Sequence, residues 1–248
     1  MSLYIPLDIA QQIQSYMDNT TYIQSRGFST SFVTFDSERT YVYDSENVLP
    51  SWVTKIIVGD RTTDCLKKSQ QLTYIDLASN KKVRKIGIKG LKVLKLGSSE
   101  VGDTAFMGLK ALKELYIQEN DKVTWRCLGA VKLTHLDCGR CFLDGGSIKH
   151  MPLEWLDVGR NSSIRGLECM IHIKYLNCGE RYSSLLTKIT NLPLEYLSIY
   201  QTITDINKFA GPLYFPSLKR LDIKQSGISS GECLLRGHPE MKIGYIQI

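Results

Sequence analysis

One eight-residue phrase recurs three times in the middle of the chain. The copies read LTHLDCGR at Leu133–Arg140, LEWLDVGR at Leu153–Arg160 and IKYLNCGE at Ile173–Glu180, so each starts 20 residues after the last. Each copy has apolar residues at its first, fourth and sixth positions. Self-similarity at a period of about 20–30 residues predicts a solenoid, in which stacked copies share a core that no single copy could bury.

The same register extends through ten copies between Val53 and Ile248. All thirty of their first, fourth and sixth positions are apolar, although only 43% of the chain is. The fourth positions are Ile56, Ile75, Leu94, Leu115, Leu136, Leu156, Leu176, Leu197, Leu221 and Ile246. Because side chains alternate along a strand, the fourth and sixth positions point into the core, and the third, fifth and seventh point outward.

The L-x-x-L-x-L pattern resembles that of leucine-rich repeats. The resemblance implies an α/β-type solenoid with a parallel β-sheet on its concave face. Most repeats span only 19–21 residues, so we expect extended or 3₁₀ segments on the convex side, with at most one short helix near Asn207–Tyr214. The ninth position often carries a side chain that bonds to buried backbone groups of the turn, and it holds Asn80, Asn120, Cys141 and Asn161.

Residues 1–50 do not follow the repeat, and we expect them to form an N-terminal cap on a solenoid of about ten strands at residues 51–248. Pro6–Met17 has the apolar spacing of a helix. Phe32–Phe35 and Thr40–Tyr43 alternate like the two strands of a hairpin.

The sequence resembles two known families in short stretches. IPLDIAQQIQSYMD at Ile5–Asp18 is similar to the first helix of an F-box, which docks on a Skp1-type adaptor while the repeats behind it hold a ubiquitination substrate. The resemblance implies an adaptor contact through Ile5, Pro6, Leu7, Ile9 and Ile13. Leu49–Asp60, Met151–Gly159 and Leu192–Ile199 resemble FNIP-type repeats, a short leucine-rich variety found in amoebae and in their large DNA viruses.

Composition bounds the cellular setting. The first residues lack the basic and apolar regions of a signal peptide, and no apolar run reaches the length of about 18 residues that spans a membrane. We therefore expect an intracellular protein, cytoplasmic or nuclear or associated with a virus particle, whose seven cysteines stay reduced.

The net charge of +6 comes from one segment, Lys67–Lys95, with nine basic residues and one acid. Its densest part is Lys81, Lys82, Arg84 and Lys85. The segment is either a solvated surface or a patch for an acidic protein or nucleic acid. It holds a single aromatic residue, Tyr74, so it offers few platforms for base stacking and argues against nucleic acid.

No catalytic or metal-binding motif stands out. Cys138 and Cys141 have the C-x-x-C spacing of a redox or zinc half-site, but Cys138 falls on a core position and no second pair accompanies it. The four histidines lack metal-ligand spacing. We expect a non-enzymatic protein that needs no cofactor and no metal.

Outward-facing residues of four adjacent repeats, which start at Leu133, Leu153, Ile173 and Leu194, predict a binding ridge. Trp, Tyr and Arg are enriched in binding hot spots, although a column of rings is also explained by stacking that stabilises the sheet. The ridge residues are His135, Asp137, Arg140, Trp155, Asp157, Arg160, Tyr175, Asn177 and Tyr196. Glycines at the seventh position, such as Gly139 and Gly159, leave room for another surface to approach.

The favoured function is a protein-interaction module that binds a protein partner through the concave face. The alternatives are a substrate receptor of an F-box-type ubiquitin ligase and a structural component of a larger assembly, such as a virus particle. Ile243, Ile246 and Ile248 fill the tenth copy of the pattern with no capping unit after them. An uncapped last strand predicts self-association, a capping subunit at this edge, or cover by the Ile228–Leu235 segment folding back, which would leave a stable monomer.

Overall fold

The computed structural model describes residues 53–59, 66, 68–78, 80–141, 143, 148–159, 166–178, 188–200 and 215–224, and the strand backbone of residues 41–43 and 242–246. Several sequence predictions lie outside the described residues. These are the F-box-like helix with Ile5, Pro6, Leu7, Ile9 and Ile13, the first strand of the expected hairpin, Arg160 and Asn161, and the expected helix at Asn207–Tyr214.

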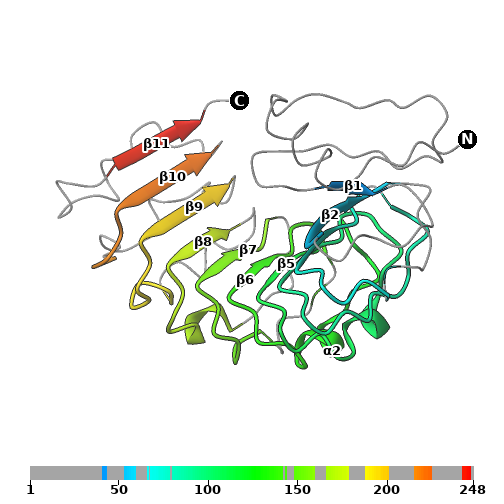
Figure 1. Ribbon diagram of the computed structural model, residues 1–248. Coiled ribbons are helices and arrows are strands. Elements are labelled where there is room, and N and C mark those ends of the chain that lie inside the picture. Colours follow the sequence, from blue (N-terminus) through cyan, green and yellow to red (C-terminus); the bar gives the residue numbers. More distant parts are fainter. Residues whose placement is uncertain are drawn as a thin grey trace, which may run out of the picture.

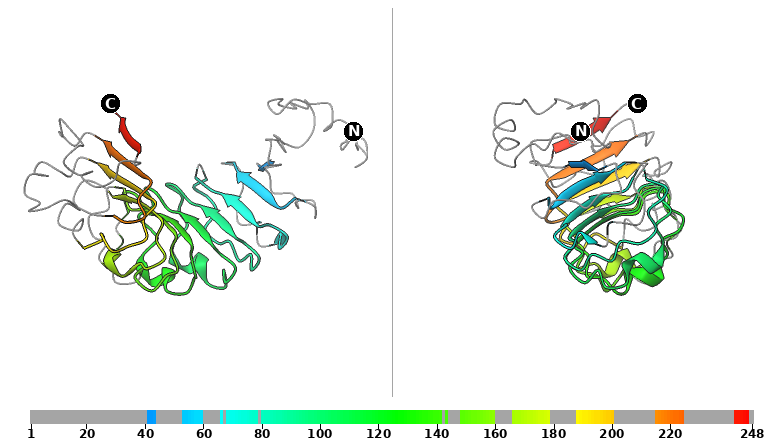
Figure 2. Two further views of the ribbon diagram at one scale, coloured as in Figure 1. Left: turned by 90° about the vertical axis from the view of Figure 1, so that its left-hand side faces the viewer. Right: turned by 45° about the vertical axis from the view of Figure 1, so that its right-hand side comes forward.

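The described residues form one eleven-stranded sheet in which every strand pairs in parallel with the next along the sequence. The strands are β1 (Tyr41–Tyr43), β2 (Lys55–Val58), β3 (Tyr74–Asp76), β4 (Val93–Lys95), β5 (Glu114–Tyr116), β6 (His135–Asp137), β7 (Trp155–Asp157), β8 (Tyr175–Cys178), β9 (Tyr196–Tyr200), β10 (Arg220–Lys224) and β11 (Lys242–Ile246). Figure 1 shows the strands side by side, and Figure 2 shows that the sheet lines the inside of an arch. The predicted parallel solenoid with its sheet on the concave face is confirmed.

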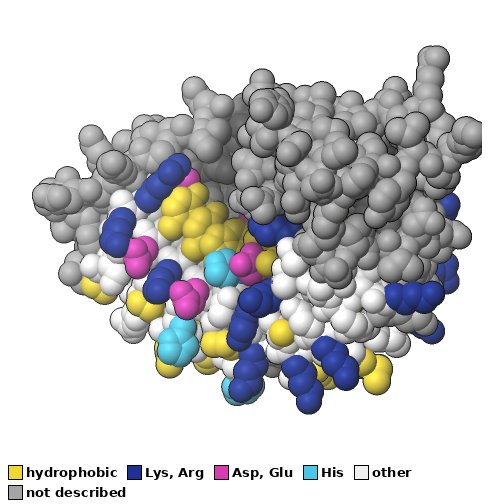
Figure 3. Space-filling model, in the orientation of Figure 1, with side chains coloured by type: hydrophobic (Ala, Val, Ile, Leu, Met, Phe, Trp, Pro, Cys, Tyr) yellow, Lys and Arg dark blue, Asp and Glu magenta, His cyan; other side chains and the backbone are white. Residues whose placement is uncertain are grey.

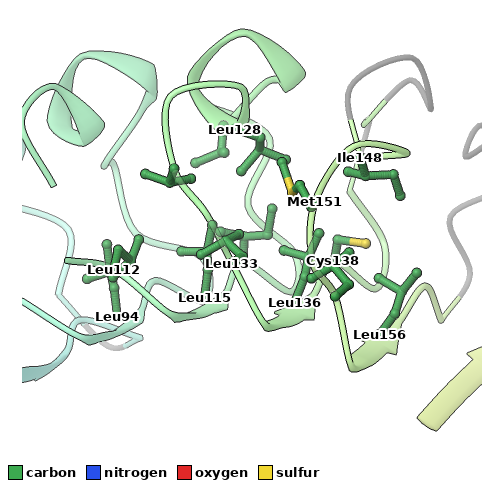
Figure 4. Packing of buried hydrophobic residues seen from close by; sticks show 14 of the residues in the cluster. Leu94, Leu112, Leu115, Leu128, Leu133, Leu136, Cys138, Ile148, Met151 and Leu156 are labelled. Carbon is green, nitrogen blue, oxygen red and sulfur yellow. The ribbon is translucent and has the colours of Figure 1, made fainter. Parts of the chain in front are cut away.

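The register of the sheet follows the hydrophobic pattern with no shift between repeats. Leu115 lies opposite Leu136, and Leu136 lies opposite Leu156. All the fourth-position residues from Ile56 to Leu221 are buried. Figure 4 shows these leucines packing beneath the sheet against residues of the convex segments, among them Leu128, Ile148 and Met151. Each repeat thus buries its apolar face against its two neighbours, as a solenoid requires.

The first strand joins the solenoid sheet, which the sequence did not predict. Tyr41–Tyr43 pairs in parallel with β2, with Tyr41 opposite Ile56 and Tyr43 opposite Val58. The expected hairpin partner, Phe32–Phe35, lies outside the described residues, so the hairpin itself stays a prediction. Residues 41–43 extend the solenoid sheet by one strand, because the Tyr-Val-Tyr sequence favours extended structure even without the leucine pattern.

Among the described residues, the convex side carries only short turns of helix, as the short repeats predict. They are the 3₁₀ helices η2 (Asp103–Phe106) and η3 (Leu167–Cys169) and the α-helical turn α2 (Trp125–Leu128). The sequence did not predict α2, which Thr124 caps by accepting a hydrogen bond from the Arg126 N–H. Across the parts of the chain that are described, no helix is long and apolar enough to cross a bilayer.

The ninth-position residues form the predicted ladder. The Asn120 amide donates to the carbonyls of Ser99 and Val101, and its oxygen accepts from the N–H groups of Lys122 and Val123. Asn80 makes the equivalent bonds two repeats earlier, beginning with Gly59 O at 2.6 Å. At the same position the next repeat has Cys141, whose thiol lies 2.8 Å from the carbonyl oxygen of Ile117. These bonds pair backbone groups that the core would otherwise bury unsatisfied.

Candidate functional site

The outward third positions of β6 to β9 carry a continuous stack of aromatic rings, which we call the ring ladder: His135, Trp155, Tyr175 and Tyr196. The centroids of His135 and Trp155 are 6.3 Å apart, those of Trp155 and Tyr175 are 4.8 Å apart, and those of Tyr175 and Tyr196 are 4.3 Å apart. The last pair is inclined by only 3°. The in-register strands bring these rings together at about the strand spacing. In Figure 3 a band of hydrophobic side chains crosses the concave face over β7 to β9.

Stacking changes what the ladder presents to a partner. The sequence predicted solvent-facing rings, but all four ladder residues are half-buried because neighbouring rings cover one another's faces. Because these faces are covered, the ring edges are what the ladder leaves to a partner, and the Tyr196 hydroxyl is already bonded to Asp222. Because the edge of an aromatic ring is electropositive, the ladder favours hydrogen-bond acceptors such as carbonyl and carboxylate oxygens.

A polar cluster closes the ladder at β10. The Tyr196 hydroxyl donates a hydrogen bond to the carboxylate of Asp222, which is only 2% exposed. Arg220 Nε donates to the other oxygen of Asp222 at 2.9 Å, and its guanidinium lies 5.5 Å from the Tyr196 centroid. Burial and the hydrogen bond to Asp222 raise the pKa of Tyr196, so its hydroxyl remains protonated. Sequence reasoning missed Asp222, although it occupies the outward fifth position of its repeat.

A second aromatic group extends the surface toward β3. The Tyr116 ring lies 6.4 Å from Trp155, and the Lys95 amino group lies 5.1 Å from the Tyr116 centroid and 5.5 Å from that of Tyr74. The Tyr116 hydroxyl donates to Glu114, and burial followed by the charge of Glu114 raises the pKa of Tyr116 to about 12. These contacts were also missed, because the sequence pattern shows which way a residue faces but not where its side chain ends.

The predicted acidic row is tied to the backbone. Oδ1 of Asp137 and Oδ1 of Asp157 accept hydrogen bonds from the N–H groups of Gly139 and Gly159 at 3.2 and 2.7 Å. Asn177 donates to Oδ2 of Asp157 at 2.8 Å. Wherever side chains are described, no cluster of three or more carboxylate, histidine or cysteine groups is arranged to hold a metal ion. The row therefore shapes the turns that follow the strands.

Asp137 gives the fold a pH dependence that can be measured. Its burial raises the pKa of this carboxyl from 3.8 to about 6, so the ionised form destabilises the folded state above pH 6, and the cost disappears as the pH falls through 6 toward 4. Asp137→Asn keeps an acceptor for Gly139 and should stabilise the protein at pH 7.5 by about 1 kcal/mol, after allowance for solvent screening. Urea unfolding at pH 7.5 and 4.5 measures this, and an equal effect at both values would contradict it.

The glycine and arginine residues of the turns make contacts that the sequence pattern did not show. A Cβ on Gly159, which has a φ of +44°, would lie 2.8 Å from Gly139 Cα, so the neighbouring repeat occupies the space that the sequence assigned to a partner. Arg140 is exposed as predicted, and its Nη1 lies 2.5 Å from Oε1 of Glu119. Arg140 and Glu119 both adopt positive φ, at 57° and 63°, and their ion pair joins two adjacent turns.

The basic residues lie apart from the ladder. Lys81, Lys82, Arg84 and Lys85 are all exposed, on the segment that leaves β3 and leads to the convex side. The structure thus brings together the ring ladder and the acidic row, but it does not place the predicted basic patch beside them. The C-x-x-C cysteines are buried and free, and burial raises the pKa of Cys138 well above its usual range, as expected of a structural cysteine.

Short parallel strands, the L-x-x-L-x-L core and the asparagine ladder together define a leucine-rich-repeat solenoid. No protein-family model matches the sequence, and no curated protein matches it either. Among solved structures, the chain is similar to an internalin (inlF) from Listeria monocytogenes str. 4b F2365, with 15% identity, a TM-score of 0.45, and coverage of 82% of this chain and 72% of that one. The resemblance to FNIP-type repeats and to an F-box stays a prediction.

Proposed function

We propose that the protein is an interaction module that binds a protein partner through the concave face of its solenoid. The observation that carries this proposal is the aromatic surface from Tyr116 to Tyr196, which is half-exposed across five adjacent strands and ends in a charged cluster at Arg220 and Asp222. Burying all of it under a partner would remove several large rings from water at once. Tyr, Trp and Arg carry much of the binding energy in protein interfaces.

The stacking geometry favours a protein over ligands that bind ring faces. Sugars and unpaired bases stack on exposed aromatic faces, but here neighbouring rings at 4.3 and 4.8 Å cover those faces. Peptide carbonyls suit the remaining ring edges. We propose no catalytic step and no cofactor for this surface.

Removing two rings should weaken partner binding. Trp155→Ala with Tyr175→Ala should reduce affinity by about 2 kcal/mol or more, measured by calorimetry against a partner identified by crosslinking and co-purification. Because these rings stack, the same change should also cost about 1–3 kcal/mol of stability, more than two solvent-facing residues would.

The matched control is Trp155→Phe with Tyr175→Phe, which keeps an aromatic ring at both positions, although a phenyl ring replaces the larger indole and one hydroxyl is removed. We expect it to retain near-native stability and most of the affinity. If the double alanine variant loses stability but binds as tightly as the native protein, the rings only stabilise the sheet by stacking and do not bind the partner.

The two alternative functions remain hypotheses from the sequence. A substrate-receptor role requires that Ile5–Asp18 bind a Skp1-type adaptor, and failure to bind the purified adaptor would exclude it. A structural role in a larger assembly, or self-association through Ile243 and Ile246, predicts a particle larger than a monomer by light scattering. An Ile246→Lys change should then reduce its size.

A further inference from the structure

The second position of each repeat forms a column along the edge of the concave face, just before the strands. From β7 to β10 this column alternates in charge, as Glu154, Lys174, Glu195 and Lys219. Lys174 Nζ lies 3.0 Å from Oε2 of Glu154, and Lys219 Nζ lies 2.5 Å from Oε2 of Glu195. Opposite charges on adjacent strands therefore pair within the protein along this half of the column.

In the other half of the column the charged residues are both lysines, and the remaining positions are threonines. Lys92 and Lys113 hold the second position before β4 and β5, and they are adjacent because the Lys113 N–H donates to the Lys92 carbonyl at 2.9 Å. Three more lysines lie one or two residues before the first position of a repeat: Lys89 before Leu91, Lys110 before Leu112 and Lys132 before Leu133. The five exposed residues, which we call the lysine edge, are Lys89, Lys92, Lys110, Lys113 and Lys132.

The five lysines of this edge are not engaged in salt bridges with described carboxylates. Like charges on neighbouring strands, about 4.8 Å apart, oppose folding slightly and gain nothing from the solenoid itself. An external anion would relieve that repulsion.

The lysine edge also runs into the ring ladder. Lys132 lies three residues before His135, whose ring begins the ladder and hydrogen-bonds to the Thr134 hydroxyl at 3.0 Å. Figure 3 shows Lys and Arg side chains recurring along the edge of the face that carries the hydrophobic band. A partner lying along the ladder would therefore reach the lysines without leaving the surface.

We propose that the lysine edge binds an acidic segment of the protein partner, adjacent to the part that covers the ladder. This inference rests on the proposed function and adds the charge of the partner to it. Lysine neutralises carboxylates as a point charge, without the bidentate geometry that arginine offers to phosphates. The ladder faces are already stacked, so the neighbouring surface lacks the platforms that bind single-stranded nucleic acid.

The test uses the full chain and a fluorescein-labelled oligoglutamate peptide, followed by anisotropy at low ionic strength. Lys92→Glu with Lys113→Glu should weaken binding by about tenfold or more, since charged contacts of this kind are screened by salt and reversed by charge. Lys92→Gln with Lys113→Gln should have a smaller effect in the same direction. The matched control is Lys81→Glu with Lys82→Glu, which changes net charge equally on the basic patch after β3 and should leave affinity within about twofold.

Three outcomes would overturn the proposal. Equal losses in the two charge-reversed proteins would mean that the peptide responds to net charge alone. No loss in either would remove the lysine edge as a binding surface, provided that circular dichroism shows both proteins folded. Tighter, lysine-dependent binding of an oligothymidine of equal charge would assign the edge to nucleic acid.

The ladder variant separates this result from the proposed function. Trp155→Ala with Tyr175→Ala leaves the lysine edge intact, so it should bind oligoglutamate like the native protein while losing affinity for the whole partner. Loss of oligoglutamate binding in that variant would place the acidic site on the ladder and contradict the proposal.

Discussion

Asn120→Ala is expected to lower the free energy of unfolding by about 3 kcal/mol or more, because it leaves buried backbone groups without partners. The Asn120 side chain makes four hydrogen bonds of 2.9–3.3 Å. It donates two to backbone carbonyls of the preceding turn and accepts two from backbone N–H groups of its own turn. Alanine replaces none of them, and the site is almost fully buried. Chemical denaturation followed by circular dichroism measures the loss.

The chain supplies the control for this experiment. Cys141 occupies the same ladder position one repeat later, and its thiol lies within hydrogen-bonding distance of the carbonyl oxygens of Ile117 and Gly139. Asn120→Cys should therefore cost less than Asn120→Ala, because a thiol still reaches the preceding turn. If alanine and cysteine cost the same, the asparagine bonds contribute little and the ladder is incidental to stability.

Leu156→Ala should destabilise the protein by about 2–5 kcal/mol by leaving a cavity at the centre of the solenoid. Leu156 has no exposed surface and lies in register between Leu136 and Leu176. A solenoid has no other core that could compensate, since each repeat packs only on its neighbours. Thermal unfolding should shift to a markedly lower midpoint.

Ile171→Ala provides the matched comparison for Leu156→Ala. It removes the same number of carbon atoms from a side chain that is 70% exposed, so it should change stability by about 0.5 kcal/mol or less. Similar costs at both positions would mean that burial does not govern the stability of this repeat, and the proposed register would have to be abandoned.

The fold could be predicted from the sequence because each repeat packs only on its neighbours in the chain, so the repeat period alone places the strands. A period of about 20 residues with apolar first, fourth and sixth positions places strands such as β6 and β7 at the third to fifth positions, where they are found. The ladder role of Asn120 follows equally from its distance after the strand. β1 was missed as a sheet strand because Tyr41–Tyr43 has the alternation of a strand without the leucines that mark the register.

The candidate site was predicted less completely. The register places Trp155 and Tyr175 side by side, but it does not show that their rings stack at 4.8 Å and cover each other's faces. Lys95 and Asp222 occupy outward positions like many other residues. Their contacts with Tyr116 and Tyr196 depend on side-chain torsions that no repeat pattern encodes.

Because neighbouring strands pair without any shift in register, distances along the concave face change only in steps of one whole strand. Excising residues 133–152 would join Lys132 to Leu153 with the leucine pattern unbroken, and Trp155 would then stand opposite Glu114 in place of His135. The lysine edge would move toward the remaining rings by one strand spacing of about 4.8 Å, and the lysines and the remaining rings would themselves be unchanged. A partner that spans both surfaces would sense that step as a change of length. Gain or loss of one repeat would therefore change the distance between the two surfaces, and so the partner that fits both, while the residues that make the contacts stay the same.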